Sequence, residues 1–117
     1  MNLIQKQKRF SILLSDLIYD LTQNGYEVTM GECWRSKAAA DWNADHGIGI
    51  SNSLHTQRLA ADLNLFKDGK YLITKDDYAV AGAIWKSYTD SDFQCCWGGD
   101  FESPDSDHFS ISHGSIR

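Results

Sequence analysis

The sequence has few of the residues that mark secreted, disulfide-stapled proteins. It contains three cysteines and one proline among 117 residues. Cys33, Cys95 and Cys96 are odd in number and two of them are adjacent, which fits neither a disulfide framework nor a cysteine-based zinc site. We therefore expect reduced thiols with mainly structural roles.

Basic residues and long apolar runs are also scarce. Eleven Lys and Arg residues against sixteen Asp and Glu residues give a net charge of −5. This balance argues against a nucleic-acid-binding protein, which usually presents a basic face. No apolar run approaches the ~18 residues that a membrane span needs. Serine and aspartate interrupt the apolar stretch at residues 10–21, so we expect no signal peptide and synthesis in the cytoplasm.

The composition is otherwise that of a folded domain, with 42% hydrophobic and 23% charged residues. The length fits one domain of roughly 100–150 residues, which can bury a core without disulfides. Neither an internal repeat nor a linker is visible. The sequence therefore predicts a single domain over residues 1–117.

Helical and strand-like hydrophobic patterns occur in the same chain, which predicts an α+β fold. Ser36 and Thr74 are suited to cap helices at their N-termini. The predicted helices cover residues 6–24, 37–45 and 75–89. The predicted strands cover residues 26–30, 60–66, 71–73 and 107–112, with a hairpin turn at residues 67–70. Residues 47–54 are expected to form an irregular loop.

Two of these strands each offer one apolar and one polar face, because side chains alternate along a strand. In the strand at residues 60–66, Leu63 and Leu65 lie opposite Asp62. In the last strand, Phe109 and Ile111 lie opposite His108. Polar groups from the two strands could therefore converge beside a shared core.

His55, Asp62 and His108 form a candidate metal site. Two neutral imidazoles and one carboxylate suit a catalytic Zn²⁺, and they leave the fourth tetrahedral position for water. No His-Glu-x-x-His helix is present, so the common helical zinc-protease motif is excluded. A histidine near an aspartate is also common as a structural pair, and the spacing leaves both interpretations open.

Two separated segments resemble a known family. Residues 53–62 have the sequence SLHTQRLAAD, and residues 105–108 have the sequence DSDH. They resemble the M15 zinc peptidases of peptidoglycan, whose pattern is Ser-x-His-x-x-Gly-x-Ala-x-Asp, then an acidic residue three positions before a second histidine. The family includes D-alanyl-D-alanine carboxypeptidases and phage L-alanyl-D-glutamate endolysins. The segments WRS at 34–36 and WGGD at 97–100 add to the resemblance.

The resemblance implies a role for each matching residue. His55, Asp62 and His108 correspond to the zinc ligands, and Asp105 corresponds to the carboxylate that handles the proton of the attacking water. Arg35 corresponds to an arginine that contacts substrate and stabilises the oxyanion. Ser53 is expected to bind substrate or to hold the loop of His55.

The resemblance also implies a fold and an activity. The fold is the hedgehog/D-Ala-D-Ala peptidase fold, a small α+β domain with an antiparallel sheet flanked by about three helices. The activity is zinc-dependent hydrolysis of a peptidoglycan stem-peptide bond, by a phage or prophage endolysin that favours L-alanyl-D-glutamate. The alternatives are a D-alanyl-D-alanine carboxypeptidase and a non-catalytic wall-binding phage protein. We expect a monomer without a separate wall-binding domain, held in the bacterial cytoplasm until lysis.

Three features lie outside the family pattern. The family glycine is replaced by Arg58, which puts the local backbone geometry in question. His46 and His113 match no motif, and we expect both to be structural or exposed. The acidic residues of the segment 100–107 are expected to gather around the metal: Asp100, Glu102, Asp105 and Asp107.

Overall fold

Five antiparallel strands form the framework of the protein. The computed structural model describes residues 1–117, and its strands follow the order β1-β2-β5-β4, with β3 paired to β2. The strands are β1 (Tyr26–Met30), β2 (Ala60–Lys67), β3 (Lys70–Tyr71), β4 (Cys95–Trp97) and β5 (His108–Ile111). The α-helices are α1 (Leu3–Gln23), α2 (Lys37–Asp45) and α3 (Lys75–Ser87). This arrangement confirms the predicted fold class, an antiparallel sheet with three helices.

The helices begin where side chains can satisfy their free backbone N–H groups. α1 starts three residues earlier than predicted because Asn2 and Gln5 form a reciprocal capping box. α2 has the predicted bounds, and Ser36 accepts a hydrogen bond at its N-terminus. Thr74 caps α3 as expected, but that helix ends at Ser87 rather than at residue 89. None of the three helices is long and apolar enough to cross a membrane.

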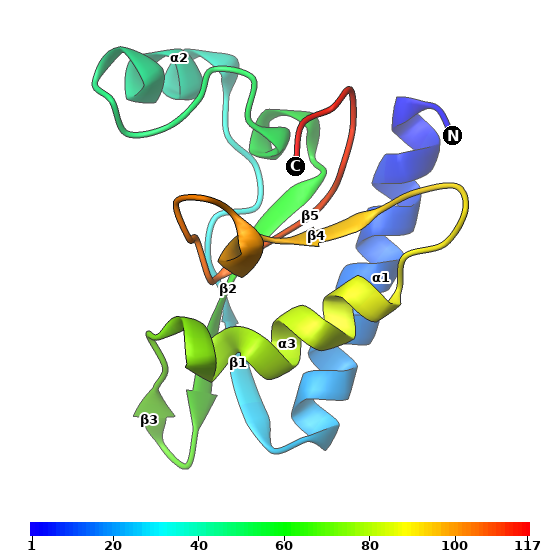
Figure 1. The fold of residues 1–117 in the computed structure, drawn as a ribbon, viewed down its shortest axis with the longest axis vertical. Coiled ribbons are helices and arrows are strands. Elements are labelled where there is room, and N and C mark those ends of the chain that lie inside the picture. Colours follow the sequence, from blue (N-terminus) through cyan, green and yellow to red (C-terminus); the bar gives the residue numbers. More distant parts are fainter.

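The core lies between the sheet and the helices α1 and α3. In Figure 1, α1 and α3 cross on one side of the molecule, whereas α2 stands apart from both. Trp85 of α3 is fully buried, and its indole N–H donates to the carbonyl of Ser110 at 3.0 Å. Side chains with no exposed surface from four elements fill the core: Leu17, Leu21, Leu63, Leu65, Trp85, Phe109 and Ile111.

β2 and β5 match their predicted bounds to within one residue at each end, and the larger differences from the prediction are at β3 and β4. β3 ends at Tyr71 because the chain turns inward at Leu72, whose carbonyl accepts a hydrogen bond from the hydroxyl of Tyr78 at 3.0 Å. The same hydroxyl accepts a bond from the N–H of Leu65 at 3.2 Å. The three-residue strand β4 was not predicted, and it forms by pairing with β5.

Candidate active site

The candidate metal ligands come from three adjacent segments. Asp62 on β2 lies directly opposite His108 on β5 in the antiparallel register. His55 belongs to a single 3-10 turn, η1 (Leu54–Gln57), which ends just before β2. The fold therefore brings two positions 46 residues apart in sequence next to each other, with a third from the preceding turn.

The three side chains meet around one carboxylate oxygen. Asp62 Oδ1 lies 3.4 Å from His55 Nε2 and 3.8 Å from His108 Nδ1, and one ligand atom from each residue lies within 4.8 Å of the others. Ligand atoms held at about 2.0–2.2 Å from a tetrahedral zinc ion lie about 3.3–3.6 Å apart. The distance from Asp62 to His55 lies in this range, and the distance from Asp62 to His108 is slightly longer. Asp62 Oδ1 is buried and has no hydrogen-bond partner. The unpaired oxygen is a free ligand for a divalent cation.

Both imidazoles are buried, with 3% of His55 and 5% of His108 exposed. Burial, together with the nearby His55, lowers the pKa of His108 to about 4. Burial also opposes the charged form of His55, but contact with Asp62 and its negative charge outweigh this, so the net pKa of His55 is raised. At neutral pH His108 is therefore the uncharged imidazole, the form that binds metals.

Two neighbours of His55 shape the turn that carries it. Ser53 caps η1, and its hydroxyl accepts a hydrogen bond from the N–H of His55 at 3.3 Å. This contact supports the expectation that Ser53 holds the His55 loop. Arg58 ends the same turn in the left-handed conformation, with φ of 55°. That conformation favours glycine, which explains the family preference at this position. The Arg58 guanidinium lies over the ring of Trp34 at 4.9 Å.

Asp105 lies at the open side of the ligand cluster. Its Oδ2 is 3.8 Å from His108 Nδ1, and 55% of its side chain is exposed. The carbonyl of Gly98 accepts a hydrogen bond from the N–H of Asp105 at 2.9 Å. The indole N–H of Trp97 donates to the carbonyl of Ser106 at 2.7 Å. The WGGD segment thus holds the loop that carries the candidate proton-transfer residue.

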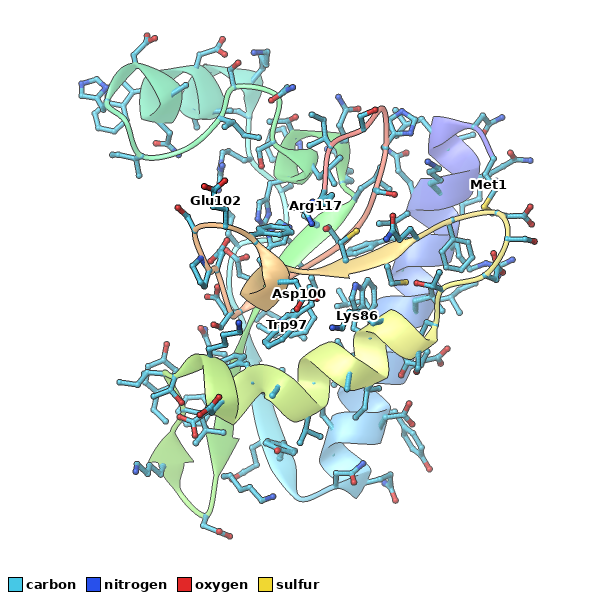
Figure 2. All side chains as sticks on the ribbon, in the orientation of Figure 1. Met1, Lys86, Trp97, Asp100, Glu102 and Arg117 are labelled. Carbon is cyan, nitrogen blue, oxygen red and sulfur yellow. The ribbon has the colours of Figure 1, made fainter.

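The acidic cluster around the metal is smaller than predicted. Asp107 lies with Asp62 and Asp105, and burial together with the adjacent Asp105 raises its pKa to about 6. Asp100 instead pairs with Lys86 of α3 at 2.8 Å, and Figure 2 shows the two side by side. Glu102 is exposed and lies neither in this carboxylate group nor in the lining of the cleft. The expectation that all four acidic residues surround the candidate metal site was therefore wrong for Asp100 and Glu102.

Arg35 is held by a residue that the sequence analysis did not identify. Glu32 accepts hydrogen bonds from Arg35 Nε, at 2.7 Å, and from Arg35 Nη2. The same Glu32 oxygen lies 3.9 Å from His55 Nδ1. The backbone of Glu32 also accepts a hydrogen bond from the N–H of Asp62 at 2.8 Å. The spacing of three residues between a carboxylate and an arginine was the only available signal for this pair.

A cleft of about 320 Å³ contains the whole predicted set of site residues. It also contains Phe101 and Arg117, neither of which was predicted. The predicted residues that line it are Arg35, Ser53, His55, Asp62, Asp105 and His108. The other two histidines lie elsewhere: His46 stacks on Trp42, and His113 contacts Lys6.

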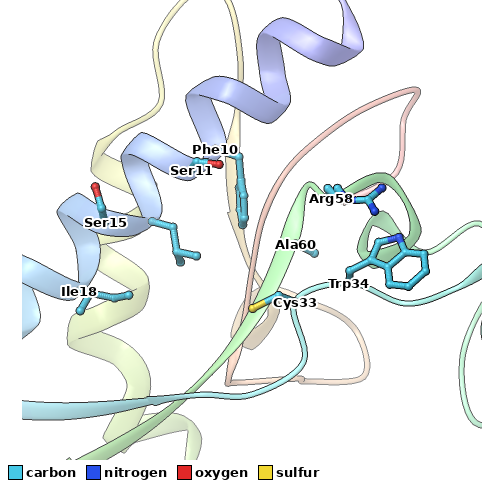
Figure 3. A pocket seen from close by; sticks show the side chains of 9 residues that line it. Phe10, Ser11, Ser15, Ile18, Cys33, Trp34, Arg58 and Ala60 are labelled. Carbon is cyan, nitrogen blue, oxygen red and sulfur yellow. The ribbon is translucent and has the colours of Figure 1, made fainter.

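A second hollow, of about 420 Å³, lies between α1 and the segment that carries Cys33 and Trp34 (Figure 3). Its walls are mostly apolar, with Phe10 and Ala60 on opposite sides. Burial raises the pKa of the Cys33 thiol, and the charge of Asp62 raises it further. The thiol therefore stays protonated, and this hollow lacks an activated nucleophile.

The comparison with protein families shows to which family this chain is related. Residues 46–111, more than half of the chain, match the D-alanyl-D-alanine carboxypeptidase model of the M15 peptidases. The chain belongs to this family. The matched range of the M15 peptidase contains η1, β2 and β5, and with them all three candidate ligands and Asp105. The resemblance on which the sequence analysis relied is therefore confirmed.

A solved structure supports the fold of this M15 peptidase. The L-Ala D-Glu endopeptidase ChiX of Serratia marcescens is similar, with a TM-score of 0.60 and 24% sequence identity. The similarity covers 73% of this chain and 66% of that chain, so the M15 peptidase matches slightly less than two thirds of the ChiX length. No curated protein matches the sequence.

Proposed function

We propose that this M15 peptidase is a zinc-dependent hydrolase of a stem-peptide bond in bacterial peptidoglycan. The observation that carries the proposal is the meeting of His55, Asp62 and His108 around an unpaired, buried carboxylate oxygen. This cluster opens into a cleft that also contains an exposed carboxylate and an arginine. Zinc, when bound there, supplies Lewis-acid chemistry that polarises a carbonyl and acidifies water.

The residues beside the ligands can perform the remaining steps of amide hydrolysis. Asp105 takes the proton of the attacking water and delivers it to the departing amine. Arg35 stabilises the negative charge that develops on the carbonyl oxygen. Glu32 binds two of its N–H groups, which leaves Nη1 to face the cleft near Gly49. Glu32 therefore fixes the direction in which Arg35 points.

The proposed bond is L-alanyl-D-glutamate, cut by a phage or prophage endolysin. The name of the similar Serratia structure supports this choice of bond. The protein would act on the wall once it is released from the host cytoplasm at lysis. The description of the matching family model favours a second candidate, a carboxypeptidase that removes the terminal D-alanine.

Digestion of purified sacculi distinguishes the two candidates. The endopeptidase exposes new amino groups on D-glutamate, which mass spectrometry of the soluble products identifies. The carboxypeptidase releases free D-alanine and leaves the L-alanyl-D-glutamate bond intact. Release of D-alanine alone would therefore refute the endopeptidase proposal and support the alternative.

The metal requirement is tested with three variants. His55→Ala removes a ligand, and we expect the purified protein to lose its zinc and its activity. Asp105→Ala keeps the ligands, so it should retain zinc but lose turnover. His46→Ala is the matched control, because this histidine is exposed and stacks on Trp42 outside the cleft. Full lytic activity in zinc-free His55→Ala protein would rule out the zinc mechanism.

A further inference from the structure

The cleft contains a second arginine, Arg117, whose guanidinium forms no ion pair within the protein. Arg35 is paired with Glu32, whereas Arg117 makes no ion pair with any carboxylate. The Arg117 guanidinium lies 4.7 Å from the centre of the Phe101 ring, which in turn lies 5.4 Å from the ring of His108. Arg117 is thus stacked one ring away from a candidate metal ligand, with its N–H donors free.

The chain after β5 is folded in a way that places Arg117 over the cleft. His113 and Ile116 exchange two backbone hydrogen bonds of 3.0 Å, which closes a tight turn and reverses the chain. Lys6 of α1 donates to the carbonyl of Ser112 at 2.9 Å, which anchors the start of the turn. Ile116 packs against the core. In Figure 2 the Arg117 side chain lies over the middle of the molecule, near the loop that follows β4.

The space beside Arg117 continues the cleft. A hollow of about 230 Å³ shares Ile50, Phe101 and Arg117 with the cleft, and Ser115 and Ile116 complete its lining. No acidic side chain lines this hollow. A hollow of about 260 Å³ shares Asp105 with the cleft, and Asp107 also lines it. The Arg117 guanidinium therefore lines one hollow that joins the cleft, and the carboxylates of Asp105 and Asp107 line another.

We propose that Arg117 and Phe101 form a carboxylate-binding subsite for the substrate. The proposal rests on the proposed peptidase function and adds to it the group that is recognised. A glutamyl residue in a peptide keeps one carboxyl group outside the main chain of bonds, and a free guanidinium matches that group with two parallel N–H donors. The ring of Phe101 packs against this guanidinium through a cation–π contact.

The test uses two peptides that contain an L-alanyl-D-glutamate bond and carry an amidated C-terminus. They differ only in whether the free carboxyl group of the glutamate is a carboxylate or a carboxamide. Binding is measured by calorimetry in Asp105→Asn protein, where no turnover disturbs the titration, and kcat and KM are measured in protein with Asp105 intact. The variants are Arg117→Gln and Arg117→Lys. Arg9→Gln is the matched control, because Arg9 also stacks on a phenylalanine, Phe93 at 5.6 Å, outside the cleft.

We expect the protein to bind the carboxylate peptide about tenfold more tightly than the carboxamide, a preference worth about 1.4 kcal/mol. Arg117→Gln should abolish the preference through a higher KM for the carboxylate peptide only. Arg117→Lys should recover part of it, and Arg9→Gln should keep all of it. A preference that survives Arg117→Gln, or none in the unaltered protein, overturns the subsite. Failure to cleave either peptide, with the binding preference intact, would instead refute the proposed bond and leave the subsite supported.

Discussion

Replacing Gly98 with alanine should disable the protein by moving Asp105. A Cβ atom on Gly98 would overlap the carbonyl oxygen of Asp105 and come within 2.8 Å of His108 Cβ, whereas ordinary contacts begin near 3.4 Å. The neighbour that must retreat is backbone, so it cannot escape by changing a rotamer. The loop that carries the candidate proton-transfer residue must therefore shift as a unit.

The expected size of the effect follows from this displacement. Overpacking of a well-packed site costs about 1–3 kcal/mol of unfolding free energy. A shift of about 1 Å in a catalytic group can reduce the rate by about 100-fold. Most molecules of the Gly98→Ala variant should still be folded at the assay temperature. Its kcat/KM should therefore fall much more than the loss of stability alone explains.

Two measurements check this prediction, urea unfolding and peptide hydrolysis at a fixed zinc concentration. Gly49→Ala is the control for stability, because its added Cβ would meet nothing closer than 3.9 Å. That variant should stay within about 0.5 kcal/mol of the unaltered protein. If Gly98→Ala has both normal stability and normal activity, the close approach of Gly98 to the Asp105 loop is not needed to position Asp105.

Three further predictions concern other contacts of the site and the thiols. Arg58→Gly should be about 1 kcal/mol more stable than Arg58→Ala in urea unfolding. Both variants lose the contact with the Trp34 ring, but only glycine adopts the left-handed backbone conformation without strain. Equal stability of the two variants would contradict this. Trp97→Phe removes the N–H that binds Ser106, so kcat should fall while the zinc content is unchanged, and an unchanged kcat would exclude this positioning role. A thiol reagent at pH 8 should label Cys33 alone in the native protein, since Cys95 and Cys96 are buried, and all three cysteines in denaturant. Labelling of all three cysteines in the native protein would disprove the burial of Cys95 and Cys96.

The local parts of the fold were predictable because their signals lie within a few residues. The bounds of α2 and β1 were correct, since Ser36 marks the start of the helix and the apolar alternation of residues 26–30 marks the strand. The end of α1 followed from Gly25, whose φ of 87° few other residues adopt. In these segments the local preference and the final fold agree.

The missed features depend on contacts between distant segments. β4 is three residues long and exists only because β5 pairs with it. The Glu32–Arg35 pair lies at the candidate site only because β2 brings Asp62 beside Glu32. The place of Arg117 in the cleft depends on the turn after β5, which is anchored to α1 by Lys6. The ligand set itself was identified through its family motif, since the spacing of His55 and Asp62 alone favoured a structural pair.

The order of the strands determines when the site can form during folding. β5 is the last strand in the sequence, yet it lies inside the sheet and is the partner that joins β4 to β2. It also carries His108, the third candidate ligand, so the pairing of β5 both joins the two halves of the sheet and completes the candidate metal site. Long-range strand pairing of this kind is a late and slow event. A chain still emerging from the ribosome, or cut before β5, therefore holds an open sheet and an incomplete set of ligands. We therefore expect no peptidase activity before β5 has paired with β2.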